Sequence, residues 1–132
     1  MILVDSSAMY ALGDDRDSNH TQATDLLARA ERVGETLMVH NYLLVEAAAL
    51  LQRRFGLDAA LTLLRDTAAS FEIHWVTPED HQQAVEHLAE QGRRRLSLVD
   101  TTSFVIMRKL GVRQYMGFDS DFEREGFTPF IG

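Results

Sequence analysis

Very short apolar runs alternate with longer helical stretches along this chain, and the alternation leaves few folds open to it. Residues 2–4, 37–39, 71–76, 114–118 and 128–131 each have the pattern of a short strand. Strands that are separated by helices need crossover connections, which favour parallel pairing and helices on both faces of the sheet. The sequence therefore predicts a three-layer α/β fold with a mainly parallel sheet of about five short strands.

The helical stretches are marked by apolar stripes, capping residues and terminal glycines. Thr77-Pro78 is a strong helix start, and Gly34, Gly56 and Gly111 each follow the last residue of a stripe. The expected helices cover residues 6–13, 19–33, 41–55, 57–70, 77–91 and 97–110. Three aromatic residues fall at core-like positions in this scheme and are expected to pack inside: Tyr10, Trp75 and Phe104.

The 132 residues, of which 45% are hydrophobic, are enough for one domain, so we expect a single domain over residues 1–132. The absence of cysteine excludes disulfides, thiolate metal sites and a cysteine nucleophile, and it fits a cytoplasmic protein. No apolar run approaches the length that spans a membrane, and the first five residues lack the basic region of a signal peptide.

The formal net charge of −7 excludes one class of nucleic-acid protein but not another. The 20 acidic residues outnumber the 13 basic ones, so broad positive potential does not coat this chain. An enzyme that meets phosphate through bound metal ions remains compatible with this charge.

Four carboxylates follow directly after apolar residues, where an isolated ionised group would carry a large desolvation cost. They are Asp5 after Leu3-Val4, Glu46 after Leu44-Val45, Asp100 after Leu98-Val99, and Asp119 after Gly117-Phe118.

Asp5 and Asp119 end predicted strands, at the edge where open α/β sheets bind ligands. If the first and fourth strands are neighbours, all four acids converge there. Without basic partners in similar settings, such a cluster favours a divalent cation, and oxygen ligands favour Mg²⁺ or Mn²⁺. The alternative is local: Asp5 caps a helix, Asp100 favours a helix's first turn, and Asp119 belongs to a turn.

In this order, the motifs resemble the PIN-domain family, and in particular the VapC-like toxin ribonucleases of toxin–antitoxin pairs. The resemblance rests on four segments spread over the whole chain: Met1-Ile-Leu-Val-Asp5-Ser-Ser-Ala8, Leu44-Val-Glu46-Ala, Leu96-Ser-Leu-Val-Asp100-Thr-Thr-Ser-Phe104 and Gly117-Phe-Asp119-Ser-Asp-Phe122.

The resemblance implies a Rossmann-like PIN fold and an endoribonuclease that hydrolyses RNA with one or two Mg²⁺ or Mn²⁺ ions. The family's acidic quartet falls on Asp5, Glu46, Asp100 and Asp119 as catalytic and metal-binding residues. The hydroxyl beside the first aspartate falls on Ser6 or Ser7, and Asp121 lies near a further acid of some members, with its role left open. The implied partners are an RNA substrate, a small antitoxin protein and a second copy in a homodimer.

Arg93, Arg94 and Arg95 form a basic run before the third motif, and they are either an RNA contact or a solvated loop. Other functions also remain open. A PIN nuclease of RNA processing would carry the same sequence motifs, and so would a non-catalytic binding module on the same fold. A phosphoacceptor receiver-like domain is disfavoured, because the expected acceptor aspartate and lysine are missing.

Overall fold

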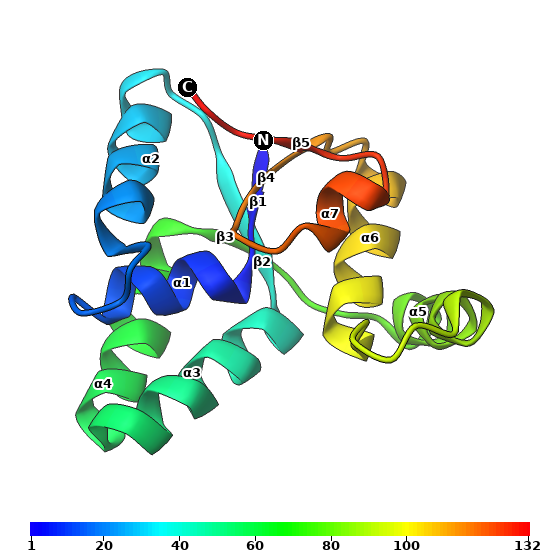
Figure 1. Cartoon of the computed structure of the whole chain (residues 1–132), viewed down its shortest axis with the longest axis horizontal. Helices are drawn as coiled ribbons and strands as arrows, with labels where there is room; N and C mark the ends of the chain where they lie inside the picture. Colours follow the sequence, from blue (N-terminus) through cyan, green and yellow to red (C-terminus); the bar gives the residue numbers. More distant parts are fainter.

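The structure, a computed structural model that describes residues 1–132, has a five-stranded sheet in the order β3-β2-β1-β4-β5 (Figure 1). Every neighbouring pair of strands is parallel, which confirms the predicted α/β class. The strands are β1 (Ile2–Val4), β2 (Leu37–His40), β3 (Glu72–His74), β4 (Gln114–Met116) and β5 (Thr128–Pro129).

Helices cover both faces of the sheet: α1 to α4 lie on one side and α5 to α7 on the other (Figure 1). None of the helices combines the length with the hydropathy that a membrane span requires. The α-helices are α1 (Ser6–Gly13), α2 (His20–Arg32), α3 (Asn41–Phe55), α4 (Leu57–Thr62), α5 (Pro78–Gln91), α6 (Leu98–Leu110) and α7 (Asp121–Arg124).

Strand β1 lies in the middle of the sheet and its three side chains are fully buried. It pairs with β4 in the register Val4↔Met116, and the ladder continues one step further because the Asp5 amide donates to the Met116 carbonyl at 2.8 Å. The first and fourth strands are therefore neighbours, as the convergence of the acids requires. Asp5 and the segment that leads to Asp119 start from the same point of the sheet edge.

The face under α6 and α7 is packed with aromatic rings. Phe104 of α6 meets Phe122 of α7 edge to face, with ring centroids 5.1 Å apart, and Phe122 stacks on Tyr115 of β4 at 4.7 Å. Both phenylalanines are fully buried. This packing fixes α6 and α7 beside the end of β4, so the acids that these helices carry are held by a rigid core.

The structure departs from the sequence prediction at three places. The stretch 57–70 is not one α-helix, because α4 is followed by a π-helical turn (Leu63–Thr67) and a short 3₁₀ turn (Ala68–Ser70). The short helix α7 was not predicted. The expectation that Trp75 packs inside is wrong: its side chain is 67% exposed, because it follows the edge strand β3, which has a neighbouring strand on one flank only.

Candidate metal centre

Asp5 is placed by the end of β1 and by the start of α1. It is the N-cap of α1, and its Oδ2 accepts hydrogen bonds from the Ser7 amide at 3.3 Å and from the Ser7 hydroxyl at 2.8 Å. Its Oδ1 is buried and has no hydrogen-bond partner in the protein. The local capping role and a ligand role are therefore compatible, since each uses a different oxygen.

Ser7 links the first strand to the fourth. Its hydroxyl donates to Asp5 and accepts from the Phe118 amide at 3.0 Å, so one side chain joins the end of β1 to the segment after β4. That segment approaches closely because residue 117 is glycine: a Cβ there would lie 2.9 Å from the Cβ of Asp5. Both features set the position of Asp119 relative to Asp5.

Replacement of Gly117 with alanine should therefore destabilise the protein by about 1–3 kcal/mol, the usual cost of forcing an extra methyl group into a packed site. The new Cβ can be accommodated only if Asp5 or the 117–119 segment moves. The free energy of unfolding, measured by urea denaturation, checks this expectation. Unchanged stability together with an unchanged position of residues 117–119 would contradict the close contact.

Asp100 enters the site from the first turn of α6. It is the N3 residue of a capping box: the Ser97 hydroxyl accepts from the Asp100 amide, and Asp100 Oδ2 accepts from the Ser97 amide at 3.1 Å. Burial raises the pKa of Asp100, and the charges of Asp119 and Glu46 raise it further. The carboxylate is thus fixed by its helix and is close enough to two other acids to feel their charge.

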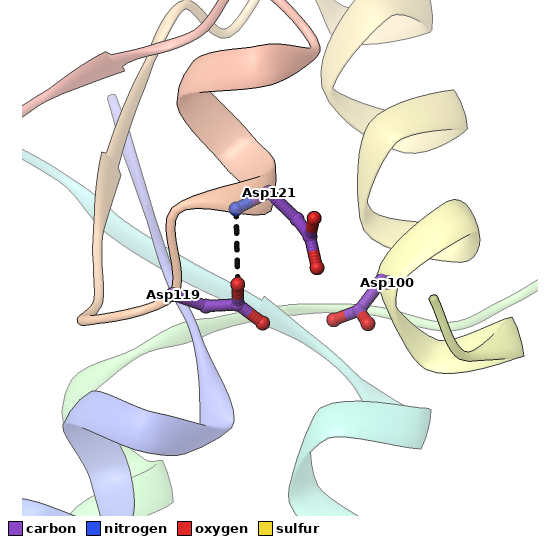
Figure 2. Close-up of side chains that lie close together, drawn as sticks. All are labelled: Asp100, Asp119 and Asp121. Carbon is purple, nitrogen blue, oxygen red and sulfur yellow. Dashed lines mark hydrogen bonds between the residues drawn. The ribbon is translucent and has the colours of Figure 1, made fainter. Parts of the chain in front are cut away.

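Asp119 lies in the turn between β4 and α7, and Asp121 is the first residue of α7. The Asp121 amide donates to Asp119 Oδ1 at 2.9 Å, which orders the turn. Figure 2 shows Asp100, Asp119 and Asp121 pointing toward one another, and each offers an oxygen within 4.8 Å of the others. The fourth motif therefore brings two carboxylates to Asp100 rather than one.

Glu46 lies on α3 and is half-buried. Its Oε1 accepts a hydrogen bond from the Ser6 hydroxyl, which ties the start of α1 to α3. Asp5 and Glu46 lie outside the group of three, but the charge of Asp100 raises the pKa of Asp5 and that of Glu46 raises the pKa of Asp100. The four predicted acids therefore share one electrostatic environment at the C-terminal edge of the sheet.

The donor set fits a hard divalent cation. All the donors are carboxylate oxygens, which suit Mg²⁺ or Mn²⁺, and the unpartnered buried Oδ1 of Asp5 is an acceptor that lacks a donor. The Asp5 pKa is raised to about 6, first by burial and then by the charge of Asp100, while hydrogen bonds from Ser7 lower it. A cation would offset both penalties, because it favours the ionised form.

A pH dependence of metal affinity follows from the raised pKa of Asp5. Because the folded-state pKa of about 6 exceeds the ordinary value of 3.8, metal-free Asp5 contributes stability at low pH that is lost as the pH rises through 6. A ligand carboxylate must be ionised, so protons compete with metal below pH 6. Calorimetric titration with Mn²⁺ should give about tenfold weaker affinity at pH 5 than at pH 7. Equal affinities at the two pH values would contradict the involvement of Asp5.

The basic run does not behave as one unit. Arg93 Nη1 lies 3.3 Å from Asp121 Oδ1, and Nη2 lies 4.0 Å from Glu125 Oε1, so this side chain is engaged with the region of α7. Arg94 and Arg95 are exposed. Arg93 thus pairs with Asp121, whereas Arg94 and Arg95 face solvent.

Sequence reasoning left the role of Asp121 open, and the structure places it in the group with Asp100 and Asp119. A signal was present, because a second aspartate two residues after Asp119 sits before an apolar residue, Phe122, that the core takes up. The short helix α7 that turns Asp121 inward is four residues long. Its periodicity is too brief to be recognised from sequence.

Comparisons with known proteins agree on this fold. The profile of the PIN domain family matches residues 2–127. The 23S rRNA-specific endonuclease VapC20 of Mycobacterium tuberculosis is 38% identical over 129 residues, which are 97% of this chain and 96% of that protein. Ribonuclease VapC26 of the same organism is 23% identical over 119 residues, 89% of this chain and 86% of that protein.

A solved structure is also similar over nearly the whole length. The crystal structure of Mycobacterium tuberculosis VapC20, described as a sarcin–ricin loop cleaving toxin, matches with a TM-score of 0.85 and 35% identity, and the match covers 97% of each chain. The acids of the four motifs all lie within residues 2–127, which the family profile matches.

Proposed function

This chain belongs to the PIN-domain family, and on that premise we propose that it is a metal-dependent endoribonuclease, the toxin of a toxin–antitoxin pair. The observation that carries the proposal is the convergence of carboxylates from β1, α3, α6 and the β4–α7 turn on one sheet edge. The named relatives are ribonucleases, which agrees with the prediction from sequence. The non-catalytic alternative is disfavoured, because no acid of the quartet is missing.

Some residues would hold the cation, and others position the side chains that hold it. Asp5, Asp100 and Asp119 would hold it, with Asp121 as a further ligand and Glu46 directed at a second ion or at the attacking water. A bound Mg²⁺ or Mn²⁺ neutralises the phosphodiester and lowers the pKa of the attacking water. Ser7 positions Asp5, because its hydroxyl is used on Asp5 and on the Phe118 amide. Ser6 orients Glu46.

We propose ribosomal RNA as the substrate class. The support is the 38% identity over nearly the full chain to an endonuclease that is named for 23S rRNA. Because ribosomes work in the cytoplasm, this substrate would place the protein there. We also propose that residues 1–132 form a single PIN-like domain. Arg94 and Arg95, exposed beside the site, are proposed RNA contacts. Arg93 would join them through its position next to Asp121.

The direct test is cleavage of purified 23S rRNA by the purified chain. With Mg²⁺ or Mn²⁺ present, primer extension should reveal a discrete cut, expected in the sarcin–ricin loop, and chelation with EDTA should abolish it. Cleavage of another RNA with the same metal dependence would keep the nuclease and reject the ribosomal substrate. No cleavage of any RNA with either metal would reject the nuclease.

Two protein partners complete the proposal. A small antitoxin is expected as the inhibitor, and a second copy of the chain is expected in a homodimer. Exposed apolar side chains on α3 and α4 support a protein-covered surface: Val45 and Leu57 are 66% and 59% exposed. Light scattering that finds only monomer at high protein concentration would reject the homodimer.

A further inference from the structure

We propose that the groove between α1 and α3 binds the RNA strand next to the metal centre, with a base against Tyr10 and a phosphate on Arg53 and Arg54. This inference rests on the proposed nuclease function. Both helices start at the C-terminal edge of the sheet, where β1 and β2 end, and they run away from it side by side (Figure 1). The contact of Ser6 with Glu46 at the metal centre therefore lies near the start of both helices, and their later turns lie farther from the acids.

The two helices are matched turn by turn. Side chains four residues apart share one face of a helix, and such a series faces the partner helix on α3 and on α1, where its last member, Asp14, directly follows the end of the helix at Gly13. The matched positions are Ser6 with Glu46, Tyr10 with Leu50, and Asp14 with Arg54. The first pair is hydrogen-bonded at the metal centre, the second lines one cavity, and in the third Arg54 Nε lies 3.6 Å from Asp14 Oδ2. On α3 the eight residues from Glu46 to Arg54 make the series about 12 Å long.

The middle of the groove is hollowed. An open depression of about 440 Å³ is lined by Tyr10, Leu50, Arg53 and Arg54, which leaves room for one side of a nucleotide. The aromatic ring of Tyr10 and the partly exposed Leu50 supply an apolar wall on which a flat base can stack. The two guanidinium groups offer paired donors that match a phosphate. Together these groups suit a nucleotide of an unpaired RNA strand.

The charges favour RNA as the occupant. Arg53 is exposed and takes part in no ion pair within the protein, whereas Arg54 is partly engaged with Asp14 and lies 5.7 Å from the Phe55 ring centroid. Arg53 is therefore a cation that is free to meet an anion, in a chain whose net charge is −7. Arg53 lies seven residues after Glu46 on α3, which is about 10 Å along the helix, so a strand bound at the acids needs to extend by only one or two nucleotides to meet it.

The test measures RNA binding in an Asp119→Asn background, in which cleavage is expected to be too slow to disturb the measurement. The probe is a fluorescein-labelled single-stranded RNA of about ten nucleotides, a length typical of single-strand sites. Arg53→Gln should weaken binding at least about fivefold. It should also reduce the slope of log affinity against log salt by about 0.7, the value for one lost phosphate contact. The matched control is Arg113→Gln, which changes an exposed arginine directly before β4, at the opposite end of the sheet. This control should change neither the RNA affinity nor the slope of log affinity against log salt.

The Tyr10 ring is tested separately. Tyr10→Leu should weaken binding at least about fivefold, the lower end for loss of a base stack, whereas Tyr10→Phe keeps the ring and should bind like the parent. If Arg53→Gln and Tyr10→Leu bind as the control does while the unsubstituted protein cleaves RNA, the subsite is overturned and the nuclease stands. Loss of antitoxin binding without loss of RNA binding would assign the groove to a protein and also overturn it. If the unsubstituted protein neither binds nor cleaves RNA, the nuclease falls and the subsite with it.

Discussion

Asp119→Asn should lower the rate of RNA cleavage by more than about a hundredfold, because loss of a direct metal ligand exceeds the 10- to 100-fold cost of changing an outer-shell partner. Asparagine retains an oxygen that can accept from the Asp121 amide, so the turn that leads into α7 is preserved. The substitution removes one negative charge from the group with Asp100 and Asp121 and leaves the fold intact. Initial rates on one RNA at saturating Mn²⁺ measure the effect.

The control for this substitution is Asp25→Asn, which makes the same chemical change at an exposed position of α2. It should cleave RNA at the rate of the unsubstituted protein. A thermal melt of each variant separates loss of activity from loss of folding. An Asp119→Asn protein that folds normally and cleaves within a few-fold of the control would remove Asp119 from the site.

Asp80→Ala should reduce the free energy of unfolding by about 3 kcal/mol, near the lower end for breaking a buried ionic network from one side. Asp80 is fully buried at the start of α5, where its carboxylate accepts from His74 Nε2 and from Lys109 Nζ, both at 3.0 Å. It also completes the capping box with Thr77. The Lys109 side chain is 45% exposed and can return to water, which keeps the cost from rising higher.

The pH dependence of this effect has a definite sign. Burial raises the pKa of Asp80, but bonds from His74, Thr77 and Lys109 outweigh it and hold the pKa below its ordinary 3.8. The stabilisation is therefore present above about pH 4 and is lost as the pH falls below it. Urea denaturation at pH 7 and pH 3 should show the Asp80→Ala deficit shrinking at the lower pH. The exposed neighbour Glu79 is the control, and Glu79→Ala should cost less than about 0.5 kcal/mol at either pH. If Asp80→Ala also lowered the free energy of unfolding by less than about 0.5 kcal/mol at pH 7, the stabilising network of Asp80 with His74 and Lys109 would be contradicted.

The sequence was informative wherever a residue's neighbours along the chain determine its position. Ile2–Val4 is predicted as a buried strand because all three residues are apolar. Thr77-Pro78 is predicted to start α5 because the Thr77 hydroxyl caps the helix and Pro78 suits its first position. The four acids stood out for the same reason, since each interrupts an apolar segment. Local patterns were enough to predict the α/β class and to select Asp5, Glu46, Asp100 and Asp119 as candidates.

What the sequence did not predict depends on tertiary neighbours. Trp75 falls in the alternating stretch 71–76, but its exposure is set by the place of β3 at the edge of the sheet, which no local pattern encodes. The pairing of Arg93 with Asp121 joins residues 28 positions apart through a helix of only four residues. The alignment of α1 with α3 depends on the angle between the two helices. That angle is set by the sheet on which both helices pack, so it cannot be read from either helix alone.

Calorimetric titration of Mn²⁺ into the RNA-free protein at pH 7 decides whether the carboxylates at this sheet edge form one metal site. The unsubstituted protein and the Asp25→Asn control should bind Mn²⁺ saturably and alike, and Asp100→Asn should bind at least about tenfold more weakly, because it removes the carboxylate that the charges of Asp119 and Glu46 act on. Equal Mn²⁺ affinity of Asp100→Asn and the unsubstituted protein, or no saturable binding by either, would contradict the metal centre.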